Sequence, residues 1–347
     1  MIDDIDATTA RVLLGLDGRR SRETVLAEAG AAGADIAVVS TLLAGLRRCD
    51  LVVDAEPLEL SALGGPDTAE RLAPDHSGLS VSGVAAPLAT LRHRRARMVA
   101  VHNTGRLGAP VASLLAAAGV GTIRLVDDEM ARPSDAAPGG LLPMDSFTPR
   151  RAGAAAAVRR AAPEVRLDTA ASGETPDLVV LAGCTPVEPV LLRSLHRLGV
   201  SHLAVSIRES TAVVGPLVVP GTTSCLTCAD LQRRDRDPAW PRLAAQLSVR
   251  RRRMSEPGEV TLTMMAAALA TAQALLWLDG GTTPTLGGTL ELRTSAPQIQ
   301  RRNWVPHPHC PCGAGRTAPR RPPERAAGPS DGTRTCAMRP APDRMGP

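Results

Sequence analysis

From Met98 onward the chain alternates short apolar runs with helical stretches, and this rhythm constrains the fold more than any other feature. Strands that are each followed by a helix form a parallel sheet with helices on its faces. Strands are expected at 98–102, 122–127, 165–168, 177–181 and 202–207, and helices at 107–118, 150–161 and 187–197. A hairpin strand at 213–220, a long helix at 260–278 and strands at 287–293 and 298–304 follow. The expected class is α/β, with a Rossmann-like, mostly parallel sheet.

Composition divides the chain into four segments. Residues 1–56 predict a small winged-helix-like unit of three helices and a short strand, in which Ser21 and Asp35 can cap helices. Residues 57–84 carry proline, glycine, serine and aspartate, which predicts a linker. Residues 85–312 hold the α/β domain. Residues 313–347 contain seven prolines, five glycines and seven arginines, and this composition predicts a disordered basic tail.

The amino-acid composition excludes several classes of function. All 40 basic residues are arginine, so chemistry that requires a lysine, such as a Schiff base or a Walker-type phosphate loop, is excluded. Only three tryptophans and one phenylalanine are aromatic, and most of the net charge of +5 comes from the tail. Proteins that bind single-stranded nucleic acid stack bases on aromatic rings. No nucleic-acid partner is therefore expected.

Two stretches bear on the location of the protein. The first ten residues are acidic and contain no apolar run, so no signal peptide is expected and the expected location is the cytoplasm. The uncharged stretch 260–278 could be a membrane span or a buried helix. Its alanines, its three threonines and Gln273 make it weakly apolar, which favours a buried helix and no membrane partner.

A glycine-containing turn lies between the strand at 98–102 and the helix that follows it. Asn103, Gly105, Arg106 and Gly108 form this turn, and Asp127 ends the next strand. Such turns bind nucleotide phosphates because glycine lets the backbone approach and the helix start offers free N–H groups, while the acid binds ribose hydroxyls. Asparagine can replace the first glycine because it tolerates left-handed backbone. A helix packed closely on its strand would need the two glycines even without a ligand.

Two pairs of cysteines predict a metal site. Cys225 and Cys228 form a Cys-x-x-Cys pair, and Cys310 and Cys312 form a Cys-x-Cys pair about eighty residues later. Four thiolates suit tetrahedral zinc, which would pin the C-terminal strands. A histidine at 307 or 309 could substitute for one cysteine. Unrelated free thiols and a redox Cys-x-x-Cys are the alternatives.

The motifs together resemble the ThiF/HesA/MoeB family of ubiquitin-activating-enzyme-like adenylyltransferases. The run from Val101 to Glu129, VHNTGRLGAPVASLLAAAGVGTIRLVDDE, is similar to that family's nucleotide loop, helix and acidic strand end, and CLTC with HCPC is similar to its zinc pairs. The stretch RESTAVVGPLVVPGTTSCLTCADL, with RDPAWPRLAAQL after it, resembles actinobacterial ThiF-like proteins of azole-forming peptide modification. In those proteins a winged-helix unit binds the leader of a precursor peptide.

The resemblance implies ATP- and Mg²⁺-dependent adenylation of a carboxylate, but four family positions differ. An Asn and an Arg of the family fall in the stretch from Ser134 to Pro138, which changes both, and its lysine falls near Arg150 or Arg151. The family's magnesium-binding Asp falls in Ala-Gly-Cys184-Thr, where no carboxylate stands. Loss of that ligand should cost several kcal/mol of transition-state stabilisation. Cys184 itself is either an acyl-accepting residue or a small buried thiol.

Three functions are therefore considered. In the first, a degenerate ThiF-like protein binds a precursor peptide and presents it to a modifying enzyme. In the second, an active adenylyltransferase uses Arg150 or Arg151 with Asp128 or Asp135 to activate a small carrier protein or peptide. The third, a nicotinamide-dependent oxidoreductase, is disfavoured by the cysteine pairs and by the absence of Tyr and Lys for proton transfer. A homodimer is left open.

Overall fold

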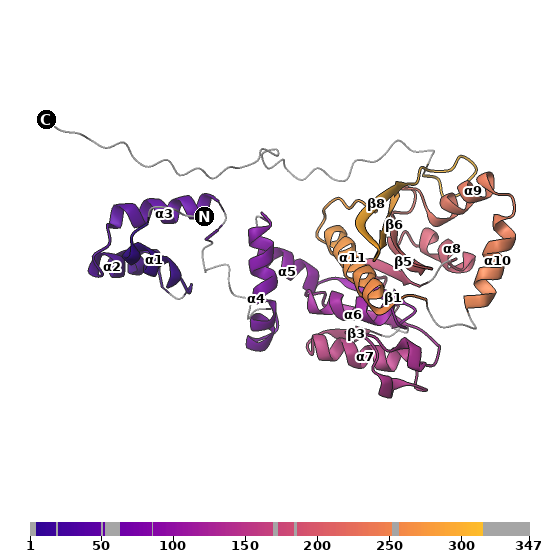
Figure 1. The fold of residues 1–347 in the computed structure, drawn as a ribbon, viewed down its shortest axis with the longest axis horizontal. Helices are drawn as coiled ribbons and strands as arrows, with labels where there is room; N and C mark the ends of the chain where they lie inside the picture. Colours follow the sequence, from indigo (N-terminus) through magenta and orange to yellow (C-terminus); the bar gives the residue numbers. More distant parts are fainter. Residues whose placement is uncertain are drawn as a thin grey trace. The chain divides into compact units, whose positions relative to one another are not determined.

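The computed structural model of the 347-residue chain describes residues 5–18, 20–49, 51–52, 63–84, 86–168, 173–183, 186–251 and 257–314. The chain divides into two compact units, and the boundary along the sequence falls between Ala89 and Thr90. Figure 1 shows the N-terminal unit in indigo to violet and the larger unit from violet through magenta to yellow.

The N-terminal unit begins with three helices, α1 (Ala7–Leu14), α2 (Arg22–Ala31) and α3 (Ile36–Arg48). Each has a capping side chain that accepts hydrogen bonds from N–H groups of the first turn. The caps of α2 and α3 are Ser21 and Asp35, as predicted. The helices enclose a small apolar core, formed by Val25, Ala29, Val39 and Leu43.

The rest of this unit differs from the sequence-based expectation. Leu51 and Val52, expected to start a strand, form a bend, and residues 53–56 lie outside the described part of the chain. The segment predicted as a linker contains the helix α4 (Pro66–Val81). The buried stripe of α4 is Thr68, Leu72, His76 and Ser80. Three of these four side chains are polar, so the helix has no apolar periodicity in the sequence.

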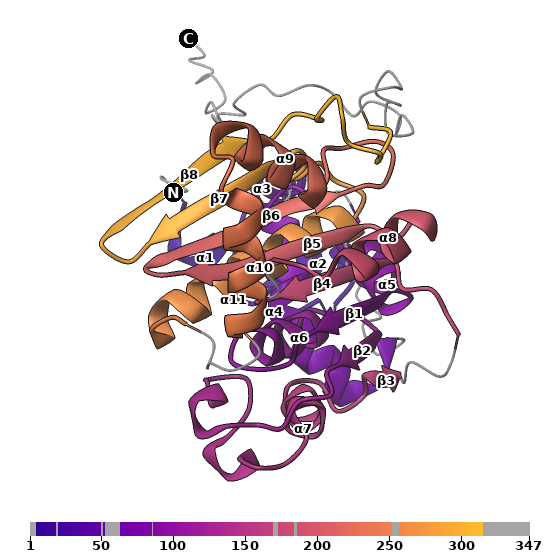
Figure 2. The ribbon, with the colours of Figure 1, turned by 90° about the vertical axis from the view of Figure 1, so that its right-hand side faces the viewer.

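The larger unit is built on one eight-stranded sheet of order β3-β2-β1-β4-β5-β6-β7-β8, which Figure 2 shows edge to edge. The strands are β1 (Met98–His102), β2 (Thr122–Val126), β3 (Arg166–Asp168), β4 (Leu178–Ala182), β5 (His202–Arg208), β6 (Thr211–Val218), β7 (Gly288–Arg293) and β8 (Ala296–Asn303). Strands β1 to β5 pair in parallel, and β6, β7 and β8 extend the sheet by antiparallel pairing. The predicted mostly parallel α/β sheet with closing C-terminal strands is confirmed.

Helices cover the sheet on two faces. The helices α6 (Gly108–Ala117), α7 (Arg150–Ala161) and α11 (Val260–Leu278) share one core with Val99 and Val101 of β1, and α8 (Pro189–Arg197) shares a second core with Ala100. This alternation follows from the two-residue period of a strand. The larger unit also contains α9 (Leu226–Arg236), α10 (Trp240–Arg251) and the short 3₁₀ turns η3 (Pro133–Asp135) and η4 (Pro143–Asp145), and α5 (Pro87–Arg95) spans the boundary between the units.

The helix α11 is the one described helix that is long and apolar enough to cross a membrane. Its Leu262, Ala266, Ala270 and Ala274 belong to the main core of the sheet domain. Burial against the sheet explains its apolar composition, so the interpretation as a core helix holds.

The sheet topology places a switch point where the site was expected. From β1 the chain moves outward through β2 to β3, then returns to β4 on the other side of β1. Open α/β sheets bind ligands at such a switch point, beyond the carboxyl ends of the strands. The residues after β1, β2 and β4 therefore meet there.

Candidate functional site

The turn after β1 has the backbone geometry of a close helix–strand junction. Asn103 has a φ of 64°, which is left-handed backbone, in agreement with its place at a glycine position. A Cβ added to Gly108 would lie 1.9 Å from the backbone oxygen of Asn103. Glycine is thus required at 108 by packing alone.

The side chain of Asn103 spans the switch point. Its Nδ2 donates to the carbonyl of Ala182 at the end of β4 (2.9 Å), and its backbone N–H donates to Val126 at the end of β2 (2.9 Å). Its Oδ1 accepts a long hydrogen bond from Arg150 Nη1 (3.4 Å). One residue therefore connects β1, β2, β4 and the start of α7.

Asp127 orders the turn from the end of β2. Its Oδ2 accepts from the backbone N–H of Thr104 (2.7 Å) and its Oδ1 from that of Glu129 (2.8 Å), and its side chain is 5% exposed. The Thr104 hydroxyl also donates to Oδ2 (3.3 Å), so Oδ1 is the oxygen that keeps a further lone pair for a ribose hydroxyl. Even without a ligand, the carboxylate has a structural role in shaping the loop.

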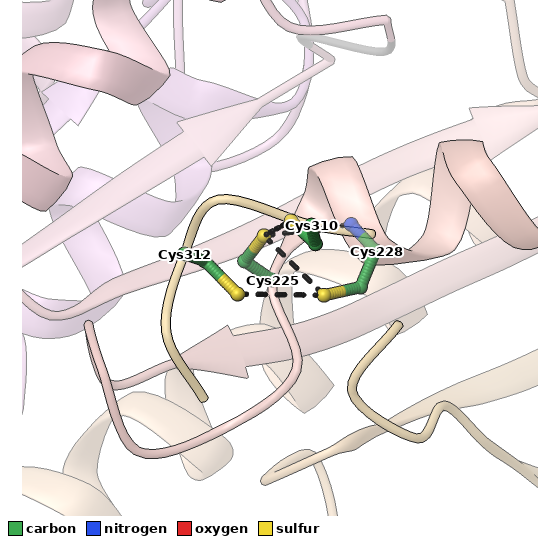
Figure 3. Close-up of side chains that lie close together, drawn as sticks. All are labelled: Cys225, Cys228, Cys310 and Cys312. Carbon is green, nitrogen blue, oxygen red and sulfur yellow. Dashed lines mark hydrogen bonds between the residues drawn. The ribbon is translucent and has the colours of Figure 1, made fainter. Parts of the chain in front are cut away.

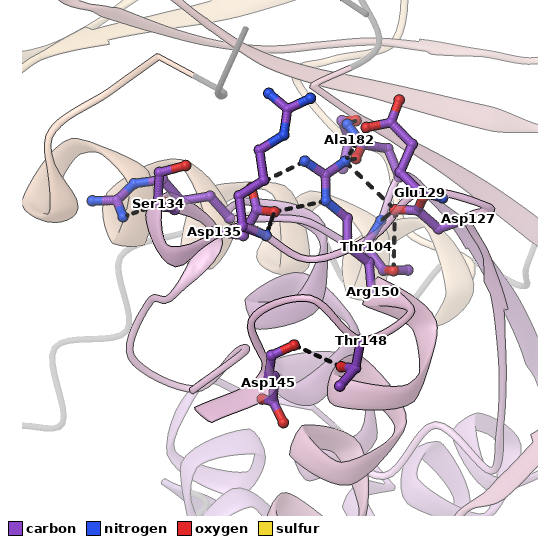
Figure 4. Close-up of polar contacts among 12 residues, drawn as sticks. Thr104, Asp127, Glu129, Ser134, Asp135, Asp145, Thr148, Arg150 and Ala182 are labelled. Atoms are coloured by element: carbon purple, nitrogen blue, oxygen red, sulfur yellow. Dashed lines mark hydrogen bonds and ion pairs between the residues drawn. The ribbon is translucent and has the colours of Figure 1, made fainter. Parts of the chain in front are cut away.

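The buried guanidinium of Arg150, at the start of α7, is the centre of a polar network in which Asp127 and Asp135 are buried and Glu129 is half exposed (Figure 4). Its Nε and Nη2 donate to the two carboxylate oxygens of Asp135, at 2.8 and 3.1 Å. Its Nη1 donates to Glu129 Oε2 at 2.8 Å and lies 4.0 Å from Asp127 Oδ2. Arg150 is 4% exposed and Asp135 is fully buried.

This network leaves Arg150 little capacity for a phosphate. A guanidinium has five N–H donors, and the hydrogen bonds to Asp135, Glu129 and Asn103 occupy four of them. Burial disfavours the charge of Arg150, but hydrogen bonding to Asp135 and attraction from the three carboxylates outweigh it and raise its pKa. Three carboxylates face one guanidinium, so the network is net negative.

The other candidate residues of this site have different surroundings. Arg106 Nη1 donates to the carbonyls of Ser134 (3.1 Å) and Ala136 (2.8 Å) and so holds η3 against the turn. Arg151 and Asp128 are exposed. Cys184 lies outside the described residues.

The four predicted cysteines come together at the C-terminal edge of the sheet domain (Figure 3). Cys225 caps α9 and Cys228 lies in its first turn, whereas Cys310 and Cys312 follow β8. Neighbouring Sγ atoms are 3.7 Å (225–228), 3.6 Å (225–310) and 3.5 Å (228–312) apart. Zn–S bonds of about 2.3 Å in a tetrahedron give an S–S edge of about 3.8 Å. The group fits a tetrahedral metal ion.

The protonation of the thiols reflects their proximity. Hydrogen bonding to Cys228 and burial raise the pKa of Cys225, and the hydrogen bond from Cys225 lowers the pKa of Cys228 to about 4. Both ring nitrogens of His307 are engaged, Nε2 with Asp235 Oδ2 (2.7 Å) and Nδ1 with the backbone N–H of His309 (3.2 Å). Among the described residues, neither histidine belongs to the metal-binding group.

Two residues of the nucleotide-site network were not singled out in the sequence. Glu129 binds Arg150 from the stretch after β2, and Thr104 donates its backbone N–H to Asp127 from the turn. The only sequence signal for Glu129 is its place in an Asp-Asp-Glu run at a strand end. Thr104 gave no signal, because its main contact with Asp127 is through the backbone N–H (2.7 Å), to which its hydroxyl adds a longer hydrogen bond (3.3 Å).

The comparisons with known proteins agree with this architecture. Residues 85–314 match the model of the ThiF family. No curated protein matches the sequence. Solved structures with a similar fold include E. coli MccB with ATP, at 17% identity, a TM-score of 0.63 and 88% coverage of each chain. The microcin C7 biosynthetic enzyme MccB in complex with N-formylated MccA has 16% identity, a TM-score of 0.63 and 88% coverage of each chain.

PaaA also has a similar fold, with 16% identity, a TM-score of 0.62 and coverage of 88% of this chain and 92% of its own. At these identities the likeness concerns the fold alone. The family model, by contrast, spans well over half of the sequence and includes both the nucleotide turn and the four cysteines. The chain belongs to the ThiF family.

Proposed function

We propose that this ThiF-family protein binds a precursor peptide through its N-terminal helical unit and presents it to a modifying enzyme, without adenylating the peptide. The main support for the loss of adenylation is the ion pair between Arg150 and Asp135. Both residues are buried, and two hydrogen bonds of 2.8 and 3.1 Å join them. Adenylation requires cationic groups that stabilise charge on the transferring phosphates. Here the buried cation of the network, Arg150, is neutralised by the protein's own Asp135.

The balance of charge supports the same proposal. ATP is an anion, and Asp127, Glu129 and Asp135 surround the only buried guanidinium of the network. The stretch 182–185 at the end of β4, where the family's magnesium-binding Asp is expected, also offers no carboxylate for Mg²⁺, which would otherwise offset this repulsion. Rebuilding the site from exposed groups such as Arg151 demands accurate placement, and a misplacement of about 1 Å can cost a hundredfold in rate.

The peptide part of the proposal rests on the family resemblance and on the fold. One structure with the same fold is of MccB, a biosynthetic enzyme of microcin C7, in complex with N-formylated MccA. The N-terminal unit has its own core and caps, so it provides a separate surface for a partner. We also propose a cytoplasmic location for the protein and zinc as the structural ion held by the four cysteines. The proposal is compatible with a homodimer.

The retained turn favours one alternative function, an active ATP-dependent adenylyltransferase that acts on a carrier protein or peptide. Gly108 and the left-handed Asn103 keep the backbone shape of a phosphate-binding turn, and Asp127 Oδ1 keeps a lone pair for a ribose. Family membership gives no support to a nicotinamide-dependent oxidoreductase.

An exchange assay separates the two functions. Purified protein is incubated with ATP, Mg²⁺, labelled pyrophosphate and candidate peptides, and we expect no exchange above background while the peptides bind. Robust exchange that Asp127→Ala abolishes would establish the adenylyltransferase instead. Peptide binding that survives removal of residues 1–56 would show that the N-terminal unit is not the binding site.

A further inference from the structure

A cavity of about 440 Å³ opens on the N-terminal unit between the start of α2 and the second half of α3. It is lined by Arg22, Leu43, Ala44, Arg47, Arg48 and Val52. Three of the six lining residues are arginines, and the other three are apolar. No carboxylate is among the described residues that line it.

The arginines approach the cavity from two helices. Arg22 is the first residue of α2, and its Nη2 donates to Ser40 Oγ of α3 (3.0 Å), which holds this guanidinium across the gap between the helices. Arg48 is the last residue of α3. Leu43 contributes an apolar wall that is 8% exposed and continuous with the core of the unit.

Four acids of this unit are engaged in helix caps or in ion pairs with Arg20. Asp6 and Asp35 cap α1 and α3 through hydrogen bonds to backbone N–H groups. Asp17 and Glu28 pair with Arg20, at 3.6 and 2.6 Å. These contacts are made with groups other than the arginines of the lining, and the described residues that line the cavity include no acid.

We propose that this cavity binds a segment of the precursor peptide in which an Asp or Glu stands close to a Leu-, Ile- or Met-sized side chain. The proposal rests on the peptide-binding function proposed above and adds the chemistry of the peptide. The carboxylate accepts hydrogen bonds from Arg22 and Arg48, and the apolar side chain packs on Leu43 and Val52. Guanidinium groups bind carboxylates through paired N–H donors, so the cavity should prefer peptides that carry a carboxylate at this position.

The apolar half of the lining distinguishes a peptide from a nucleic acid. Binding of a nucleic acid without base contacts rests on many phosphate contacts along a basic stripe. Here the arginines are confined to one cavity beside Leu43, and no aromatic side chain lines it for base stacking. A short acidic and apolar segment matches both halves of the surface.

The test is a selection from a displayed random peptide library on the full-length protein. We expect the recovered peptides to be enriched in Asp or Glu next to Leu, Ile or Met. In the double variant Arg22→Glu, Arg48→Glu, binding of these peptides should fall by about tenfold or more, since hydrogen bonds to charged groups contribute roughly that much. The same variant should select basic peptides instead.

A matched control carries two charge reversals in the other unit, at Arg193 and Arg197, which are both exposed. This control should bind the selected peptides as the parent protein does. Circular dichroism of both double variants should show the helix content of the parent protein, and the pair Arg22→Gln, Arg48→Gln repeats the test without reversing charge.

The outcomes separate this inference from the proposed function. The acidic specificity is overturned if the selected peptides need the N-terminal unit but carry no excess of Asp or Glu. It is also overturned if they bind the Arg22→Glu, Arg48→Glu variant as tightly as the parent protein. Either result leaves the peptide-binding function standing. No enriched peptide at all, or tighter binding of a single-stranded oligonucleotide than of any peptide, overturns both.

Discussion

The substitution Asp135→Asn tests whether the protein's own ion pair blocks the nucleotide site. Asp135 is fully buried and accepts three hydrogen bonds, from Arg150 Nε (2.8 Å), Arg150 Nη2 (3.1 Å) and the backbone N–H of Arg132 (2.8 Å). Asparagine has nearly the same shape, but it removes one negative charge and replaces one acceptor oxygen with an NH₂ donor. At least one N–H of Arg150 then loses its acceptor and becomes available to a phosphate.

The magnitude follows from these contacts. One hydrogen bond between a guanidinium and a charged acceptor contributes roughly 1.5–3 kcal/mol, and each 1.4 kcal/mol is about tenfold in affinity. We therefore expect Asp135→Asn to tighten ATP binding by about ten- to a hundredfold. Loss of one partner of a buried ion pair costs up to about 3–5 kcal/mol of folding stability. The remaining contact of Arg150 with Glu129, at 2.8 Å, keeps the expected loss toward the lower end of that range.

Isothermal titration calorimetry with ATP and Mg²⁺ measures the affinity, and thermal unfolding reports the stability. The matched control is Asp145→Asn, because Asp145 also accepts a backbone N–H in a 3₁₀ turn (Leu142, 2.7 Å) but has no described ion pair with Arg150. Adding Arg150→Ala to Asp135→Asn should remove the gain. Unchanged ATP affinity in the folded Asp135→Asn protein, or tight ATP binding by the parent protein that the substitution weakens, refutes the blocking role.

Three further predictions concern stability. Elemental analysis should find about one zinc per chain, and Cys310→Ser with Cys312→Ser should remove the metal and lower the melting temperature, whereas unchanged zinc content would contradict the assignment. Gly108→Ala should lower the free energy of unfolding by about 1–3 kcal/mol, because the added Cβ would overlap the backbone. Gly78→Ala in α4, where an added Cβ has nothing within 4 Å, should leave the free energy of unfolding unchanged or raise it in the same unfolding assay. Burial lowers the pKa of His202 to about 4, so the unfolded chain binds the proton first as the pH falls from about 6.5. The free energy of unfolding should therefore drop by up to about 3 kcal/mol toward pH 4. Urea titrations in which the His202→Gln variant shows the same drop would contradict this.

Local patterns in the sequence determined the elements of the sheet domain. The predicted bounds are confirmed residue for residue for three elements, namely β1, α7 and α11. Their sequences report these bounds because burial against a sheet imposes a regular apolar period. The cysteine spacings identified four thiols that the structure brings within 4.8 Å of one another. Glycine at 108 could also be explained beforehand, since its role is a local close approach.

Only the tertiary structure decided what the glycine-containing turn after β1 can do. The sequence shows Arg150 as a candidate phosphate ligand and Asp135 as a changed family position, fifteen residues apart with no periodic relation. The crossover from β2 to α7 brings them together as a buried pair, which Glu129 contacts from a half-exposed position. No pattern of hydrophobicity reports such a contact, because charged residues set no period. The basic cavity of the N-terminal unit has the same origin, since Arg22 and Arg48 belong to different helices and become neighbours only when α2 packs on α3.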